Sequence, residues 1–339
     1  MRFDSFRIQD FGFKQWLDHG HAAKQSLSKS RKKAFDILGL GAVAVDDFIY
    51  VEHYPLPDEK ARVVGRQRKC GGLTAIALVA AARLGARCAY AGVLGHDELS
   101  RFALECMERE KIDVSSVKQT AGARPIYSNI VVDQQRGTRN IFFDVAGFVG
   151  ANVEAPASLI ESCRVLFVDN FRLPGMIRAA RLARRAGIPV VADFESQGGS
   201  RFPELLALTN HLILSRGFAA ALTGKRSPDK ALRALAGPTH EVVVITCGAD
   251  GCWFWSKELS APGYLNAFKV KAVDTTGCGD VFHGAYAFAL ARNLALSERL
   301  RLASAAAALK ASSNGGPAAI PTLGKVKKFL KHELPDSSC

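Results

Sequence analysis

The 339-residue sequence lacks several features that mark specialised classes of protein. No apolar run reaches the ~18 residues that a membrane-spanning helix requires, and no internal repeat or low-complexity tract is evident. The N-terminal segment has neither the apolar core nor the cleavage site of a secretory signal, and its acidic residues are untypical of an organelle transit peptide. These absences favour a globular, cytoplasmic protein.

Cysteine spacing also excludes some classes of protein. Eight cysteines are present, but no Cys-x-x-Cys pair occurs, and most lie in apolar surroundings as buried thiols do. Cys247 and Cys252 flank a glycine-bearing turn, which makes a metal site there only a weak alternative. We expect reduced thiols in a cytosolic enzyme, and the metal ligands stay unassigned.

Positive charge is in excess, with a net charge of +13. Such a balance raises nucleic acid or an anionic surface as a partner. Lys and Arg are nevertheless scattered along the chain, no recognised nucleic-acid module is present, and the one dense cluster lies at 29–33. We therefore expect no specific nucleic-acid partner and no membrane partner, but a protein that handles anionic small molecules.

The order of apolar segments predicts an α/β fold. After Pro156, short apolar strands alternate with helical segments, at 165–168, 190–192, 211–214 and 242–246 for the strands and at 176–185 and 229–235 for two of the helices. Strands this uniformly apolar are usually covered on both faces. We expect a doubly wound, mostly parallel sheet with helices on both faces.

Two further segments are typical of β-structure outside that sheet. Residues 60–69 have a polar strand pattern, and 126–143 form a hairpin around a turn that contains Gly137. We expect them to form a small β lid. The predicted organisation is a flexible extension over 1–33, one domain over 34–332 that carries the lid, and a C-terminal tail over 333–339.

The segment 273–285 is the most informative in the chain, because a strand end, a glycine-rich loop and an apolar helix follow one another. Small residues at Gly277, Cys278 and Gly279 let peptide N–H groups converge on one point, where the helix dipole also favours an anion. A carboxylate beside a bound polyanion costs Coulomb energy, so its presence there suggests a function. Asp280 is suited to accept a proton from an alcohol that attacks phosphorus, and an ordinary capped helix start is the alternative.

This segment resembles the signature of the ribokinase-like (PfkB) carbohydrate kinases, and the resemblance extends over about residues 35–332. Three other motifs support it: Gly39-x-Gly41 followed by Asp46, Gly71-Gly72 followed by a helix, and a strand with a glycine turn at 244–251. A dinucleotide fingerprint fails, because its third glycine is missing. The resemblance implies a ribokinase-like fold and an ATP-dependent carbohydrate kinase.

The resemblance also assigns roles to particular residues. It implies Asp280 as catalytic base, with the amides of Gly277, Cys278 and Gly279 covering the transferred phosphoryl group. For the sugar it implies Asp46, Gly71, Gly72 and Thr74, and for the nucleotide Ser215, Thr246, Gly248, Gly251, Thr275 and Asn314. A turn aspartate is the alternative for Asp46, because only one of Asp46 and Asp47 can point inward from a strand.

The sequence departs from the family pattern at two places. Many members carry sugar-binding Asn residues after the glycine pair, but Leu73 and Ile76 stand there, so an ordinary pentose or hexose should not bind in the usual way. The glutamate of an Asn-x-x-Glu motif is missing at Phe218. The resemblance implies Mg²⁺, which we expect ATP phosphates and water to hold, and a monovalent cation near 303–317 is a further candidate.

Among the branches of the family, the sequence looks most like the sulfofructose kinase and ketohexokinase-like branches. Basic residues near the predicted lid and pocket could face an anionic sugar, with solvated surface charge as the alternative: Lys60, Arg62, Arg136, Arg139 and Arg172. We expect phosphorylation of a primary hydroxyl on a sugar or anionic sugar derivative, with a ketose such as fructose or sulfofructose favoured.

Two other functions stay open. A nucleoside kinase would share every phosphate-side motif, and a catalytically silent ligand-binding member of the fold would explain the missing Asn and Glu. The intact set Gly277-x-Gly279-Asp280 argues against silence, because an anion site without catalysis does not need a carboxylate. An exposed lid edge is also compatible with a homodimer formed by strand pairing.

Overall fold

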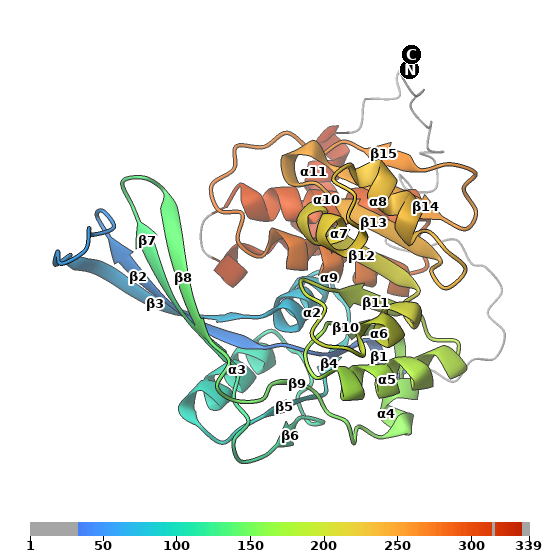
Figure 1. The fold of residues 1–339 in the computed structure, drawn as a ribbon, viewed down its shortest axis with the longest axis horizontal. Helices are drawn as coiled ribbons and strands as arrows, with labels where there is room; N and C mark the ends of the chain where they lie inside the picture. The colour runs from blue at the N-terminus through green and yellow to red at the C-terminus, as the bar shows by residue number, and fades with distance from the viewer. Residues whose placement is uncertain (1–32, 314–315, 334–339) are drawn as a thin grey trace.

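The structure is a computed structural model that describes residues 33–313 and 316–333. The expected extension, apart from Lys33, and the expected tail beyond Glu333 lie outside the described residues. An eight-stranded sheet forms the centre, in the order β15-β14-β13-β12-β11-β10-β1-β4 (Figure 1). No helix of the described ranges has the length and apolar character needed to cross a membrane.

The central sheet is parallel apart from one edge. The strands from β13 to β4 run parallel, whereas β14 and β15 are antiparallel. The bounds of the strands are β1 Phe35–Leu40, β4 Cys88–Tyr90, β10 Cys163–Val168, β11 Val190–Asp193, β12 His211–Ser215, β13 Val242–Thr246, β14 Cys252–Ser256 and β15 Gly263–Leu265.

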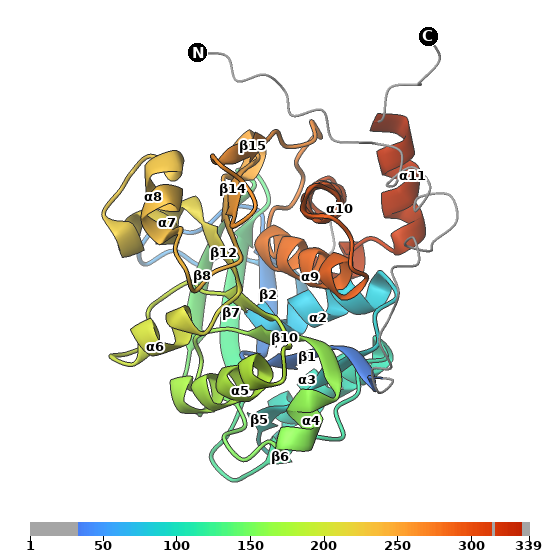
Figure 2. The ribbon, with the colours of Figure 1, turned by 90° about the vertical axis from the view of Figure 1, so that its right-hand side faces the viewer.

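Helices cover both faces of this sheet, because successive side chains of each strand point to opposite sides. Ile37 and Phe167 belong to one core cluster, and their neighbours Leu38 and Leu166 belong to the other. The first cluster includes α2 (Leu73–Arg83), α3 (Glu98–Arg109), α9 (Cys278–Ala291), α10 (Leu296–Ala311) and α11 (Leu323–Glu333). The second includes α4 (Ala157–Glu161), α5 (Leu173–Arg185), α6 (Phe202–Ala207), α7 (Arg216–Thr223) and α8 (Pro228–Leu235). Figure 2 shows the two layers, which confirm the predicted fold class.

A separate four-stranded sheet, the lid, projects from this core (Figure 1). Its order is β3-β2-β7-β8, with β2 at Ala44–Val51, β3 at Val63–Gly71, β7 at Ile126–Asp133 and β8 at Thr138–Asp144. The sequence placed only the segments around β3, β7 and β8 in a lid. It missed β2, because β2 follows β1 after three residues and nothing in its pattern tells which sheet it joins. A small third sheet contains β5 (Gly92–Leu94), β6 (Lys118–Gln119) and β9 (Gly150–Ala151).

The order in which the chain adds strands to the sheet changes direction at β1. After β1 the chain passes through the lid and α2 to β4 on one side, and it later returns to β10 on the other side. In open α/β sheets, a ligand crevice lies beyond the carboxyl ends of the strands at such a point. Ala42 and Asp169, which follow β1 and β10, mark this place.

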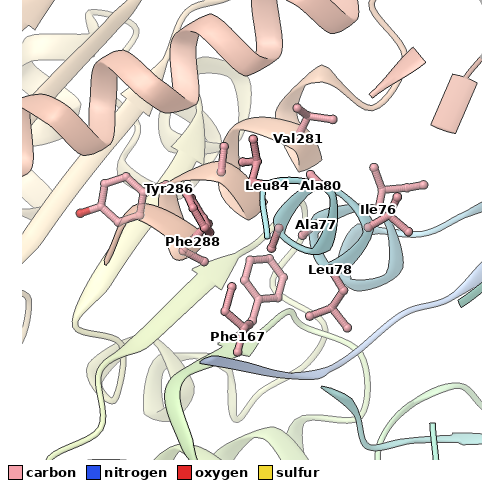
Figure 3. Packing of buried hydrophobic residues seen from close by; sticks show 14 of the residues in the cluster. Ile76, Ala77, Leu78, Ala80, Leu84, Phe167, Val281, Tyr286 and Phe288 are labelled. Carbon is pink, nitrogen blue, oxygen red and sulfur yellow. The ribbon is translucent and has the colours of Figure 1, made fainter. Parts of the chain in front are cut away.

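Helices α2 and α9 pack together unusually closely. A Cβ atom at Gly284 would lie 2.1 Å from the carbonyl oxygen of Ala77 in α2, so no side chain fits at this position. Figure 3 shows the surrounding cluster, in which α2, α9 and Phe167 of β10 meet. The contact fixes the height of α9 above the sheet.

Gly284→Ala is therefore expected to push α9 away from α2 and to destabilise the fold by about 1–3 kcal/mol, the usual cost of overpacking. Thermal unfolding measures this as a lower Tm. Gly324→Ala in α11 is the matched control, because a Cβ there meets nothing within 4 Å and alanine favours a helix. Equal Tm values for the two variants would contradict the close packing.

Candidate active site

A cavity of about 300 Å³ lies between the lid and the crevice of the central sheet. The lid contributes Asp46 and Ser128, and the segment after β11 contributes Glu195. Gly277 and Asp280 enter from the start of α9. The cavity thus brings together residues that are far apart in the sequence.

The loop before α9 borders this cavity with Thr276 and Gly277. Gly277 precedes the helix with φ 73°, a left-handed conformation that glycine adopts without strain. The Cys278 amide donates to Thr275 O at 3.3 Å, so this predicted anion donor is already engaged. The amides of Gly277, Gly279 and Asp280 have no acceptor among the residues that the structure describes. These three N–H groups can donate to an anion, as the first N–H groups of a helix commonly do, and we call residues 274–280 the anion loop.

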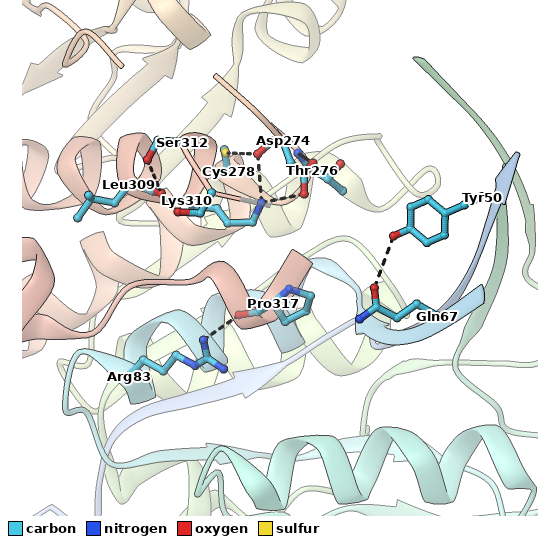
Figure 4. A network of polar contacts seen from close by, with 11 residues as sticks. Tyr50, Gln67, Arg83, Asp274, Thr276, Cys278, Leu309, Lys310, Ser312 and Pro317 are labelled. Carbon is cyan, nitrogen blue, oxygen red and sulfur yellow. Dashed lines mark hydrogen bonds and ion pairs between the residues drawn. The ribbon is translucent and has the colours of Figure 1, made fainter. Parts of the chain in front are cut away.

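A buried lysine anchors this loop (Figure 4). Lys310 of α10 is 1% exposed, and its Nζ donates to the backbone oxygen of Asp274 at 3.1 Å and to Oδ2 at 3.2 Å. Asp274 Oδ1 accepts the Thr276 amide at 2.9 Å, and Ala311 O accepts the Asp274 amide at 3.1 Å. The loop is therefore fixed to the C-terminal end of α10, where a cation is also favoured by the helix dipole.

The carboxyl group of Asp280 has a raised pKa. Burial is the main cause, and the neighbouring carboxylates of Asp193 and Glu195 raise the pKa further. His283 lies one turn further along α9, with Nδ1 2.8 Å from Gly279 O and Nε2 3.0 Å from Ile213 O. These contacts make His283 a support for the start of the helix, since it is buried and does not line the cavity.

The two adjacent aspartates of β2 point in different directions. Asp46 lines the cavity, and burial raises its pKa. Asp47 instead pairs with Arg68 at 2.7 Å and accepts the Tyr127 hydroxyl at 2.8 Å. The strand alternation therefore directs Asp46 inward, where it is placed to accept a hydrogen bond from a ligand hydroxyl.

Comparison with known proteins agrees with this arrangement. Residues 36–323 match the model of the pfkB family carbohydrate kinases. The chain belongs to this family. It is 32% identical over 270 residues to a ribokinase of Mus musculus, across 74% of this chain and 81% of that protein. The resemblance stated from the sequence is confirmed at the level of the family, and the protein is an ATP-dependent sugar kinase.

Solved structures show the same fold. A crystal structure of a putative ribokinase from Agrobacterium tumefaciens superposes with a TM-score of 0.81 at 25% identity, over 88% of this chain and 98% of that one. The structure of Arabidopsis thaliana ribokinase complexed with ribose and ATP superposes with a TM-score of 0.75 at 22% identity, over 88% and 99%. The kinase therefore shares its whole architecture with ribokinases.

Asp169 shapes the floor of the kinase site. Its Oδ2 accepts the Ala42 amide at 2.5 Å and the Thr74 hydroxyl at 2.9 Å, and burial raises its pKa to about 7. A Cβ at Gly41 would lie 2.1 Å from this oxygen, which explains the glycine. Thr74 was expected to bind sugar, but it is fully buried, bonds to Asp169 and does not line the cavity.

Two other expected sugar-binding residues also lie outside the cavity lining. Arg139 is exposed on β8, and Arg172 lies over the ring of Phe148 at 4.8 Å. Gly71 and Gly72 do line the cavity, as expected. Arg139 is a lid residue whose side chain reaches solvent, whereas Arg172 directly precedes α5, outside the lid.

The expected nucleotide-side residues gather at another strand end. Ser215 and Thr246 are direct partners at the ends of β12 and β13, and Gly248 and Gly251 form the following turn with positive φ angles. Thr275 lies on the anion loop, and Asn314 lies outside the described residues. Apart from Asn314, the nucleotide-side positions thus lie at the carboxyl edge of the sheet or on the anion loop.

The sequence did not point to Glu195, Ser128, Lys69 or Lys310 as site residues. Lys310 had a signal, because it is a lone charge in the alanine-rich part of α10. Glu195 is the second residue after β11, near the carboxyl end of a parallel strand, where ligand-binding residues gather. Ser128 and Lys69 had none, because the predicted lid strands did not reveal which of their side chains face the cavity.

The pH dependence of kcat/KM should reveal the electrostatics of Asp280. Asp280 must be deprotonated to act as a base, so activity rises as the pH passes its raised pKa. Glu195→Gln removes a negative charge that raises this pKa, and we expect the acid limb of the pH profile to move to lower pH. Glu258→Gln, at an exposed turn, is the control. A limb that stays in place or moves to higher pH would contradict the coupling.

Proposed function

We propose that this kinase transfers the γ-phosphoryl group of ATP to a primary hydroxyl of a sugar or anionic sugar derivative, with a ketose such as fructose or sulfofructose favoured. The observation that carries the proposal is the position of Asp280. Asp280 lines the cavity together with Gly277, whose amide, like that of Gly279, has no acceptor within the described ranges. A base next to an anion site is what phosphoryl transfer to an alcohol requires.

In this mechanism the sugar hydroxyl lies within hydrogen-bond reach of Asp280 and of the γ-phosphorus. Asp280 takes the hydroxyl proton as the new oxygen–phosphorus bond forms and the bond to the β-phosphate oxygen breaks. The amides of Gly277 and Gly279 donate to the phosphoryl oxygens, on which negative charge is spread in the transition state. Closure of the lid over the sugar excludes water and suppresses ATP hydrolysis.

Mg²⁺, when bound with ATP, neutralises charge on the phosphate oxygens. In the described part of the chain, no group of three or more His, Cys, Asp or Glu side chains is arranged to hold a metal ion. We infer that phosphates and water supply most of its ligands. A monovalent cation near the end of α10 is a further candidate, although the ammonium of Lys310 already takes two oxygens of Asp274.

Several observations support the choice of substrates. Leu73 and Ile76 line the cavity, so their apolar side chains stand where Asn residues contact substrate hydroxyls in relatives. The ribokinase of Arabidopsis thaliana, which shares the fold, was solved with ribose and ATP.

The cysteines in the described ranges are free, which supports a reducing, cytoplasmic location.

A substrate panel tests the proposed function directly. ADP release is measured with neutral ketoses, anionic ketoses, aldoses and nucleosides, each with ATP and Mg²⁺. We expect turnover with at least one sugar that has a free primary hydroxyl, and the strongest with a ketose. Turnover with nucleosides alone, or with no acceptor, would overturn the proposal.

Asp280→Asn should separate binding from chemistry. The change removes the proton acceptor but keeps the shape, so we expect kcat to fall roughly 10²-fold or more with little change in ATP affinity. Steady-state kinetics and calorimetric titration with MgATP measure the two quantities. An unchanged kcat would remove Asp280 from the mechanism.

We also propose that the kinase forms a homodimer through the lid. The edge strand β8 is exposed along its whole length, and its apolar side chains Phe142 and Phe143 are 54% and 70% exposed. Unpaired strand edges with apolar side chains favour pairing with a second copy.

Phe142→Asp should weaken this dimer, because a charge would enter the apolar contact. Light scattering is expected to show a monomer for this variant and a dimer for the wild type. Leu56→Asp is the control, since Leu56 is 68% exposed in the loop between β2 and β3, away from the β8 edge. A wild-type monomer would refute the dimer.

A further inference from the structure

A buried lysine of the lid has no assigned role. Lys69 is 8% exposed near the end of β3, and it lines the cavity. It is the direct strand partner of Asp46, whose carboxyl group also lines the cavity. Lys69 therefore places a cationic side chain on the inner face of the lid.

The ammonium group of Lys69 is not neutralised by a partner. Within residues 33–313 and 316–333 it forms neither a hydrogen bond nor an ion pair, and its Nζ lies 4.3 Å from the centroid of the Phe48 ring. The other cavity-lining lysine differs, because Lys310 is bonded to both oxygen types of Asp274. Asp274, a carboxylate that acts on Lys69, is thus already engaged by Lys310.

The surroundings hold Lys69 in place. A Cβ at Gly316 would lie 2.8 Å from Lys69 Cδ and 3.3 Å from Nζ, so this glycine leaves room for the lysine. The neighbouring lid side chains Phe48, Ile130 and Ile141 are apolar and also line the cavity. A charge in such surroundings is costly when unpaired and attracts a counter-ion more strongly than it would in water.

The charges of the cavity are also unevenly distributed. The carboxylates that act on Asp280 are Asp193, Glu195 and Asp46. The charged groups that act on Lys69 are Asp274, Lys310 and Asp46. Three carboxylates thus act on Asp280, whereas the two lysines of the cavity lining act on each other, and Asp46 acts on both Asp280 and Lys69.

We propose that Lys69 is an anion-binding subsite of the cavity and takes an anionic oxygen group, a carboxylate, sulfonate or phosphate, of a bound substrate. The inference rests on the proposed function, which it deepens by naming the group that would select an anionic sugar. Two molecules can bring such a group. One is the acceptor sugar through an acidic substituent, and the other is ATP through the phosphoryl group in transfer.

Lys69→Met, which removes the charge but keeps most of the stem, tests the subsite. Lys69→Arg keeps the charge, and Arg66→Met removes an exposed charge from the same strand. Steady-state kinetics are measured with fructose, with sulfofructose and with varied ATP. Thermal unfolding in sodium sulfate, against sodium chloride of equal ionic strength, reports anion binding without requiring turnover.

The kinetic results distinguish the two sources. If the sugar brings the anion, KM for sulfofructose rises about 10- to 100-fold in Lys69→Met, the scale of a charge-assisted hydrogen bond, while KM for fructose stays nearly constant. If ATP brings it, kcat falls and KM for ATP rises with both sugars. In either case Lys69→Arg should retain most of the wild-type behaviour, and Arg66→Met all of it.

The same experiments can also contradict the proposed subsite. In the wild type, sulfate should raise Tm more than chloride does, and Lys69→Met should lose this difference. Lys69→Met with unchanged kinetics and an unchanged sulfate effect would overturn the subsite while leaving the kinase function intact. If no sugar is phosphorylated, the proposed function fails, and the sulfate effect still decides whether Lys69 binds anions.

Discussion

The position of the N-terminal end of α9 is the constraint on which the rest of the site depends. Two contacts set it: Gly284 lies against the backbone of Ala77 in α2, and the Lys310 ammonium holds the segment at Asp274 from α10. Because α2 begins at the glycine pair after β3, the same packing ties the anion loop to the base of the lid. The two walls of the cavity are thus positioned by one cluster of helices.

Burial of charge is the second organising feature. Asp169 directly follows β10 and Asp193 ends the adjacent parallel strand β11; both are buried, as is the carboxyl group of Asp280, which lines the cavity. Asp169 is held by hydrogen bonds from Ala42, Thr74 and Phe171, which compensate its desolvation in part. Carboxylates concentrated in this way raise one another's pKa values, and such perturbed groups are typical of catalytic sites.

Much of the scaffold could be predicted from the sequence. The apolar strands at 165–168 and 242–246 and the helix at 229–235 are observed with little or no shift, because their periodicity is set by burial on one face or both. Arg83 illustrates what could not be predicted. Its guanidinium bonds to the carbonyl oxygens of Pro317 and Ile320, more than two hundred residues away (Figure 4), and no local pattern encodes such a contact.

The candidate site also has features that the sequence predicts and features that it does not. The sequence alone determined the anion loop and Asp280, because a glycine-rich turn before a helix and the acid beside it are local features of the backbone. Only the tertiary structure decided which lid charges face the cavity. It placed Lys69 in the cavity and left Arg139 outside, because the side on which a strand residue lies depends on the partner strands and on the core that the sheet covers.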